Sequence, residues 1–150
     1  AGGAARGVVL ALKGLGFTDI RIANRTMERA VALAEAFELA VIDWEKRSQD
    51  LENIDLLVNT TSLGMSGQPS LEMDISALKF SALVADIVYA PLKTDLLIKA
   101  QENGHETVDG LAMLMHQAVP GFRQWFGGEA RVDDELRGEL VKELNRRGKT

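Results

Sequence analysis

Apolar and polar positions follow two different rhythms along this chain. Apolar side chains three or four positions apart predict helices at residues 4–13, 24–37, 94–100, 110–126 and 133–144. Short alternating or wholly apolar stretches predict strands at residues 19–23, 39–42, 54–59, 83–88 and 107–108. Because strands alternate with helices, the pattern predicts an α/β fold in which helices cover both faces of a doubly wound, mostly parallel sheet. Pro120 predicts a kink or break in the fourth helix.

A glycine turn opens the chain directly before the first predicted helix. We interpret Gly2 as the second glycine of a dinucleotide-binding fingerprint and Ala5 as its third, Gly-or-Ala position. Residues Ala1, Gly2, Gly3, Ala4 and Ala5 would then hold a pyrophosphate against the amides of the helix N-terminus. The first strand of the sheet would lie outside the chain, leaving two strand edges unpaired. The alternative is that the two glycines belong to a linker.

Polar side chains after the second predicted strand, about 20 residues beyond the glycines, predict which dinucleotide binds. An NAD site places a carboxylate there, whereas this chain has Asn24, Arg25 and Thr26, followed by Arg29. Arg25 and Arg29, four residues apart on one helical face, would pair with a 2′-phosphate, and Asn24 and Thr26 would add hydrogen bonds. Alternatively, Thr26 only caps the helix and both arginines are solvated. With the glycine turn at this distance, we favour NADP.

Composition excludes several classes of protein. The 150 residues are 46% hydrophobic and 26% charged, which fits one globular domain. The net charge of −5, without clustered Lys and Arg, argues against nucleic acid or a membrane as the main partner. The absence of cysteine excludes disulfides and thiolate metal sites, and no metal site is expected. No signal peptide or membrane-spanning stretch is visible. We expect a cytoplasmic protein, as a monomer or a homodimer.

Five segments together resemble the shikimate dehydrogenase family. They are GGAAR at residues 2–6, NRTMER at 24–29, NTTSLGM at 59–65, DIVYAPL at 86–92 and DGLAMLMHQA at 109–118. The resemblance implies a Rossmann-like NADP domain and NADP-dependent interconversion of 3-dehydroshikimate and shikimate, on the route to aromatic amino acids. It also implies a separate N-terminal domain that carries the catalytic Lys and Asp.

On this resemblance, residues 1–150 form the NADP-binding domain, and the helices from about residue 110 pack back on it. No catalytic residue is expected within the chain, and the isolated chain is expected to be inactive. Because the chain begins with Ala1 and not with Met, we expect it to be part of a longer protein.

The resemblance also implies roles for single residues. Thr60 and Thr61 would line the path of the cofactor, although both also suit a plain turn after a strand. Ile87 and Gly110 would frame the nicotinamide, Gly110 because a side chain there would obstruct the ring. Met113 would pack near the same ring, although a helical Met is more often part of a core. Tyr89 and Gln117 would contact the substrate through hydroxyl and amide groups. His116 is given no role.

Three other functions remain open at this point. The nearest is an enzyme of the same family that acts on quinate or another small acid. The second is a catalytically silent dinucleotide-sensing module. The third is a structural α/β domain without a ligand, which the glycine turn and the two arginines make the weakest of the three.

Overall fold

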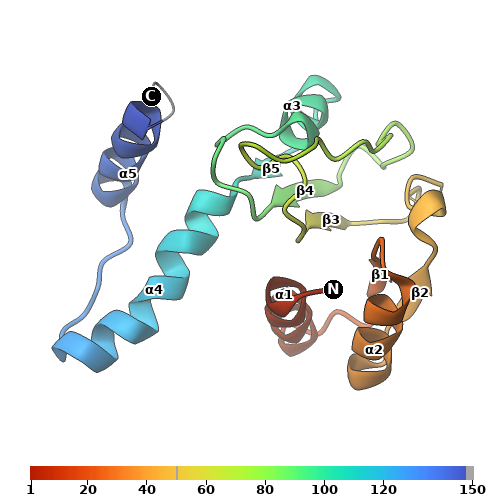
Figure 1. Cartoon of the computed structure of the whole chain (residues 1–150), viewed down its shortest axis with the longest axis horizontal. Coiled ribbons are helices and arrows are strands. Elements are labelled where there is room, and N and C mark those ends of the chain that lie inside the picture. The colour runs from red at the N-terminus through yellow and green to blue at the C-terminus, as the bar shows by residue number, and fades with distance from the viewer. Residues whose placement is uncertain (50, 148–150) are drawn as a thin grey trace.

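The computed structural model describes residues 1–49 and 51–147 (Figure 1). Its helices are α1 (Gly3–Gly14), α2 (Met27–Phe37), α3 (Asp95–Glu102), α4 (Gly110–Phe126) and α5 (Asp134–Arg147), with a short 3-10 helix η1 (Trp44–Lys46). Its strands are β1 (Arg21–Ala23), β2 (Ala40–Ile42), β3 (Leu56–Asn59), β4 (Leu83–Asp86) and β5 (Thr107–Val108). The predicted alternation of helices and strands is therefore confirmed.

The strands form two parallel sheets. β1 pairs with β2, aligning Ile22 with Val41, and β4 lies between β3 and β5, aligning Val84 with Leu57 and with Thr107. Among the described residues, no strand pairs with both β1 and β3. The division of the sheet at this point agrees with the expectation of two unpaired strand edges.

A cavity of about 260 Å³ lies between the two sheets. Apolar side chains of α1, β1 and β3 line it, among them Val9, Ile22 and Leu57. The hydrophobic core is divided in the same way. One cluster joins α1 and α2 to β1, and the other joins α3 to β4. The cavity therefore separates two cores that each pack around their own sheet.

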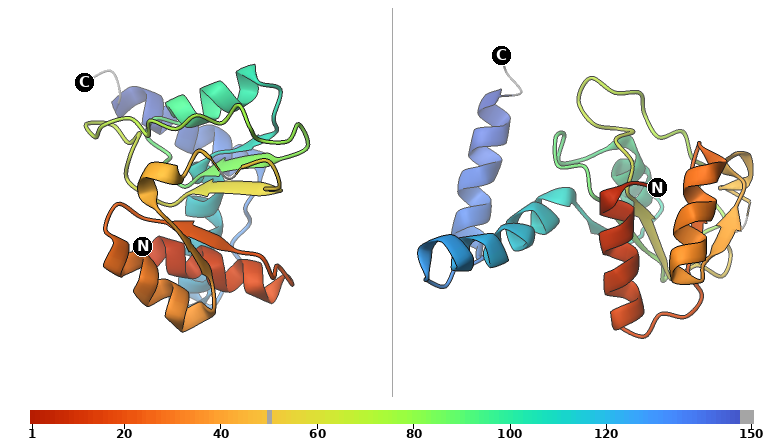
Figure 2. Two further views of the ribbon diagram at one scale, coloured as in Figure 1. Left: turned by 90° about the vertical axis from the view of Figure 1, so that its right-hand side faces the viewer. Right: turned by 60° about the horizontal axis from the view of Figure 1, so that its bottom comes forward.

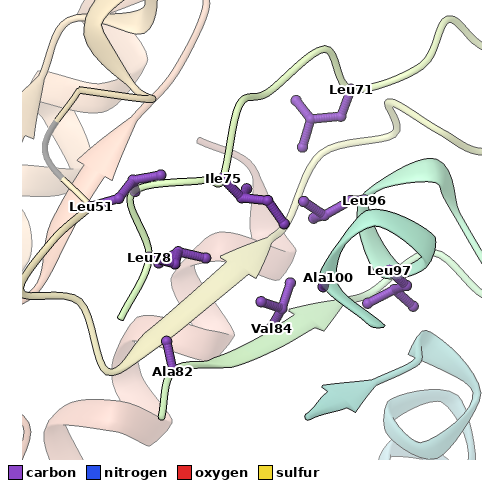
Figure 3. Packing of buried hydrophobic residues seen from close by; sticks show 9 residues of the cluster. All are labelled: Leu51, Leu71, Ile75, Leu78, Ala82, Val84, Leu96, Leu97 and Ala100. Atoms are coloured by element: carbon purple, nitrogen blue, oxygen red, sulfur yellow. The ribbon is translucent and has the colours of Figure 1, made fainter. Parts of the chain in front are cut away.

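The larger core packs α3 onto β4. Figure 3 shows Leu96, Leu97 and Ala100 of α3 facing Val84 of β4, and all four side chains are almost fully buried. The helix begins at Asp95 because Thr94 caps it, with its hydroxyl accepting a hydrogen bond from the Leu97 amide at 3.4 Å. This cap fixes α3 beside the carboxyl end of β4.

Helices α4 and α5 extend away from the sheets (Figures 1 and 2). Only the first turns of α4 are buried, at Gly110, Leu111 and Met115. Of the predicted kink or break at Pro120, the break is wrong, because α4 continues through this exposed residue to Phe126, and the kink stays a prediction. None of the described helices combines the length and apolar character that crossing a bilayer requires. That these helices pack back on the domain stays a prediction.

Candidate cofactor-binding site

The candidate site is built from loops that follow the strands. Asn24 follows β1, Thr60 follows β3 and Ile87 follows β4, while Gly110 begins α4 directly after β5. Ligands of open α/β sheets bind beyond the carboxyl ends of parallel strands. The residues predicted for the site therefore lie where such a fold binds its ligand.

The glycine turn leaves open space in front of α1. Gly2 is the N-cap of α1 in an extended conformation (φ −107°), and a Cβ added at Gly2 or Gly3 would meet nothing within 4 Å. The fold itself thus leaves room for a side chain at both positions. Ala5, in contrast, is only 3% exposed and packs in the same cluster as Ile22, so a small residue there lets α1 approach β1.

Asn24 ties the glycine turn to the start of α2. Its side-chain amide donates a hydrogen bond to the Thr26 carbonyl at 2.8 Å, and its Oδ1 accepts one from the Ala1 amino group. The amide of Asn24 therefore holds the loop together whether or not it also contacts a phosphate.

Arg25 and Arg29 are two exposed cations without an ion pair or hydrogen bond to the described residues. The argument that they share a helical face is wrong, because α2 begins at Met27 and Arg25 lies before it. Arg29 nevertheless lies close enough to the glycine turn for its charge to act at the nitrogen of Ala1.

The helices that start at this site lack side-chain caps. Within residues 1–49 and 51–147, no side chain accepts a hydrogen bond at the N-terminus of α1 or α2, where the N-cap residues are Gly2 and Thr26. Thr94 and Asp109, in contrast, cap α3 and α4 with their side chains. The alternative in which the Thr26 side chain caps α2 is therefore wrong. The first amides of α1 and α2 remain available to an anion.

The side chain of Thr61 forms hydrogen bonds within the turn that follows β3. Its amide and its hydroxyl both donate hydrogen bonds to Asn59 Oδ1, at 3.0 and 2.8 Å, and its Oγ1 accepts one from the Leu63 amide at 3.1 Å. Thr60 lines the cavity between the sheets. A contact of either threonine with a cofactor stays a prediction.

A buried carboxylate that the sequence analysis did not single out lies at the end of β4. Asp86 is 2% exposed, and its oxygens accept hydrogen bonds from Asn59 Nδ2, the Val88 amide and Thr94 Oγ1 at 2.8–3.0 Å. Desolvation raises the pKa of Asp86, and the three hydrogen bonds oppose it. Two signals in the sequence mark this group: a polar residue ends each buried strand, and Asp86 begins the DIVYAPL segment.

Gly110 is required by the backbone around it. A Cβ at this position would lie 2.1 Å from the carbonyl oxygen of Ile87 and 2.6 Å from the carbonyl carbon of Val88. The Gly110 amide also donates a hydrogen bond to the Val88 carbonyl at 3.2 Å. The structure thus gives a reason for this glycine other than room for a nicotinamide ring, and proximity to the ring stays a prediction.

The remaining predicted residues lie on or beside α4. Tyr89 is 39% exposed after β4, and Met113 is half-buried one turn into α4. Gln117 and His116 are exposed further along the helix. The structure assigns no ligand contact to any of them, so their roles stay predictions.

An ion pair links α5 to Asp109, the N-cap residue of α4. Arg137 donates hydrogen bonds to both carboxylate oxygens of Asp109, at 3.2 and 2.5 Å, and Asp109 also accepts one from the Leu111 amide. Desolvation would raise the pKa of Asp109, but the Arg137 guanidinium and the backbone hydrogen bonds outweigh it and leave the pKa lowered. The start of α4 is thereby fixed from two sides.

Comparison with known families identifies the chain. Residues 1–88 match the model of the shikimate / quinate 5-dehydrogenase family, which is more than half of the sequence. The chain belongs to this family. A curated relative, shikimate dehydrogenase (NADP(+)) of Paramagnetospirillum magneticum, is 55% identical over 143 residues, which are 94% of this chain and 52% of the relative.

Solved structures of family members resemble the fold. Quinate dehydrogenase from Corynebacterium glutamicum in complex with NAD gives a TM-score of 0.85 at 33% identity, over 95% of this chain and 52% of that one. Shikimate 5-dehydrogenase from Thermus thermophilus in complex with NADP(H) and shikimate gives 0.75 at 33% identity, over 97% and 52%. This likeness confirms the Rossmann-like fold. The chain spans about half the length of the curated relatives it matches.

Proposed function

We propose that this chain binds NADP(H) as part of a shikimate dehydrogenase that interconverts 3-dehydroshikimate and shikimate. The observation that carries the proposal is the pair of exposed, unpaired cations, Arg25 and Arg29, beside two helix N-termini without side-chain caps. A 2′-phosphate is the group of NADP that pairs with arginine and that NAD lacks. The residue directly after β1 is Asn24, where an NAD site places a carboxylate to hydrogen-bond the ribose.

The residues proposed for the site would contact the cofactor along its whole length. The open space at Gly2 and Gly3 admits a pyrophosphate close to the α1 amides. Arg25, Arg29 and the Thr26 hydroxyl would hold the 2′-phosphate, and Thr60 and Thr61 would line the path between the two halves of the cofactor. Ile87, Gly110 and Met113 would frame the nicotinamide. When bound, NADPH supplies the hydride that reduces the ketone.

The part played by this chain is to bind and orient. Tyr89 offers a hydroxyl and Gln117 an amide, which both donate and accept hydrogen bonds, as a polyol carboxylate requires. Reduction of a ketone also needs a proton donor at the carbonyl oxygen. We assign that role to no residue of this chain, and in this proposal it falls to the part of the enzyme that the chain does not match in its relatives.

Cofactor preference tests the proposal directly. Calorimetric titration of the chain should give tighter binding of NADP⁺ than of NAD⁺. Replacement of Arg25 and Arg29 by alanine should lower the affinity for NADP⁺ by about 10- to 100-fold, because charge-assisted hydrogen bonds are lost. The affinity for NAD⁺ should change by less than about threefold. Arg131→Ala, an exposed arginine between α4 and α5, is the matched control. Equal loss for both cofactors would contradict the assignment.

The reaction needs a second experiment. A chimera should join this chain to the part of the P. magneticum relative that it does not match, and shikimate-dependent NADPH formation should then be measured. Activity with quinate and NAD⁺ instead would favour the quinate type of the family. A folded chimera that binds NADP⁺ and oxidises neither acid would favour a dinucleotide-sensing module.

A further inference from the structure

The Asp86 carboxylate joins three segments that are far apart in the sequence. Asn59 Nδ2, from the end of β3, donates to its Oδ1 at 3.0 Å, and Thr94 Oγ1, from the N-cap of α3, donates to its Oδ2 at 2.8 Å. The Val88 amide donates to Oδ1 at 2.9 Å. No cation pairs with this carboxylate among the described residues, so three neutral donors are what holds it in the interior.

Each partner is itself fully engaged. Asn59 uses both hydrogens of its amide, toward Asp86 and toward the Leu63 carbonyl, and its oxygen accepts twice from Thr61. Thr94 donates to Asp86 and accepts from the Leu97 amide. A carboxylate accepts only, so it satisfies all three donors at once, which a neutral amide in its place does not.

The segment that these hydrogen bonds fix is residues 87–89. The Ile87 amide bonds to the Asn59 carbonyl at 3.1 Å, and the Val88 carbonyl accepts from the Gly110 amide at 3.2 Å. Val88 is buried, at 5% exposed, whereas Ile87 is half-buried and Tyr89 is 39% exposed. These two side chains are the ones proposed to meet the nicotinamide and the substrate.

We propose that Asp86 is a positioning residue for the nicotinamide end of the site, acting with Asn59 and Thr94. Its carboxylate sets the direction in which β4 leaves the sheet, and with it the positions of Ile87 and Tyr89. It touches neither cofactor nor substrate. The adenosine end, at Arg25 and Arg29, belongs to a different loop and a different core, so the network has no means of acting there. This inference rests on the proposed binding of NADP(H).

Two ligands separate the two ends of the site. NADP⁺ occupies both ends, whereas adenosine 2′,5′-bisphosphate carries only the adenosine end. Thr94→Val removes the hydroxyl with little change of shape and leaves Asp86 Oδ2 without its donor. This variant should lower the affinity for NADP⁺ by about three- to tenfold more than it lowers the affinity for the bisphosphate, which is the effect of one buried hydrogen bond. Asp86→Asn keeps the shape of the side chain but turns an amide toward Thr94. It should likewise lower the affinity for NADP⁺ more than the affinity for the bisphosphate.

Two further variants show whether the effect is positional. Thr94→Ser keeps the hydroxyl and should retain the ratio of the two affinities. Leu78→Ala, a buried residue of the same core outside the network, should lower the melting temperature without changing that ratio. Parallel weakening of both ligands in Thr94→Val and Asp86→Asn would overturn the inference and leave a structural role. If the unsubstituted chain binds neither ligand, the proposed function fails, and the inference fails with it.

Discussion

Replacement of Gly110 by alanine introduces a methyl group where backbone already lies. The new Cβ would be 2.1 Å from the Ile87 carbonyl oxygen and 2.3 Å from its carbon. Neither atom can turn away as a side chain does. Restoring an acceptable contact requires the start of α4 to withdraw by about 1 Å, which stretches the 3.2 Å hydrogen bond from Gly110 to Val88 beyond a useful length.

The expected destabilisation follows from three contributions. Forced displacement in a packed site costs about 1–3 kcal/mol, and the lost hydrogen bond about 0.5–1.5 kcal/mol. Alanine restricts the unfolded chain more than glycine does, which offsets up to about 1 kcal/mol. We therefore expect Gly110→Ala to lower the free energy of unfolding by about 2 kcal/mol.

Urea denaturation followed by far-ultraviolet circular dichroism measures this change. Gly121→Ala is the matched control in the same helix, because its Cβ would meet only the Trp125 ring at 3.6–3.8 Å, an ordinary contact. It should stabilise the chain by about 0.5–1 kcal/mol, as alanine does inside helices. A change of less than about 0.5 kcal/mol in Gly110→Ala would refute the argument that the backbone of Ile87 and Val88, directly after β4, demands this glycine.

Three further predictions concern the ion pair, the cavity and the reaction. The pKa of Asp109 is lowered in the folded chain, so its carboxylate stabilises the fold at pH values above the unfolded-state pKa of about 3.9. This stabilisation is lost as the pH falls below that value and through the folded-state pKa. Arg137→Gln should therefore reduce the difference in unfolding free energy between pH 7 and pH 3, by about 0.5 kcal/mol for a half-buried pair that solvent still screens, in urea titrations at both pH values. An apolar peptide able to form a parallel strand should fill the cavity between β1 and β3 and raise the melting temperature in scanning fluorimetry, and the same peptide with a central proline should not. The 150 residues alone should form no NADPH from shikimate and NADP⁺ in an absorbance assay at 340 nm, so turnover by this chain would contradict the assignment of proton transfer to another part of the enzyme.

Local pattern accounts for most of the fold. The apolar run at residues 83–88 predicts a strand, and β4 occupies its first four positions. The run is longer than the strand because the Val88 amide turns to the Asp86 carboxylate and not to a neighbouring strand. The start of α2 is displaced from the expected Asn24 to Met27 because the Asn24 side chain bonds to the Thr26 carbonyl and keeps that segment outside the helix. In both cases one polar side chain competes with regular backbone pairing.

Long-range polar contacts leave no such pattern. Asn59 and Asp86 are 27 residues apart and Asp86 and Thr94 are 8 apart, and the residues of each pair belong to different elements, so no helical or strand period relates them. The close approach of Gly110 to Ile87 likewise depends on where β5 pairs with β4. Only the assembled structure brings these atoms together, so their roles could not be derived from spacing.

The two ends of the site are built on different physical principles, and this has a consequence for its variants. At the adenosine end, exposed arginines and uncapped helix N-termini offer charge that the fold does not use for its own stability. Substitution of Arg25 or Arg29 should therefore change which cofactor binds while the unfolding free energy stays within about 0.5 kcal/mol. At the other end, Asp86 and Gly110 are parts of the core, so binding and stability change together there. A change of cofactor preference is thus the more accessible alteration of this domain, and it should arise in the loop after β1.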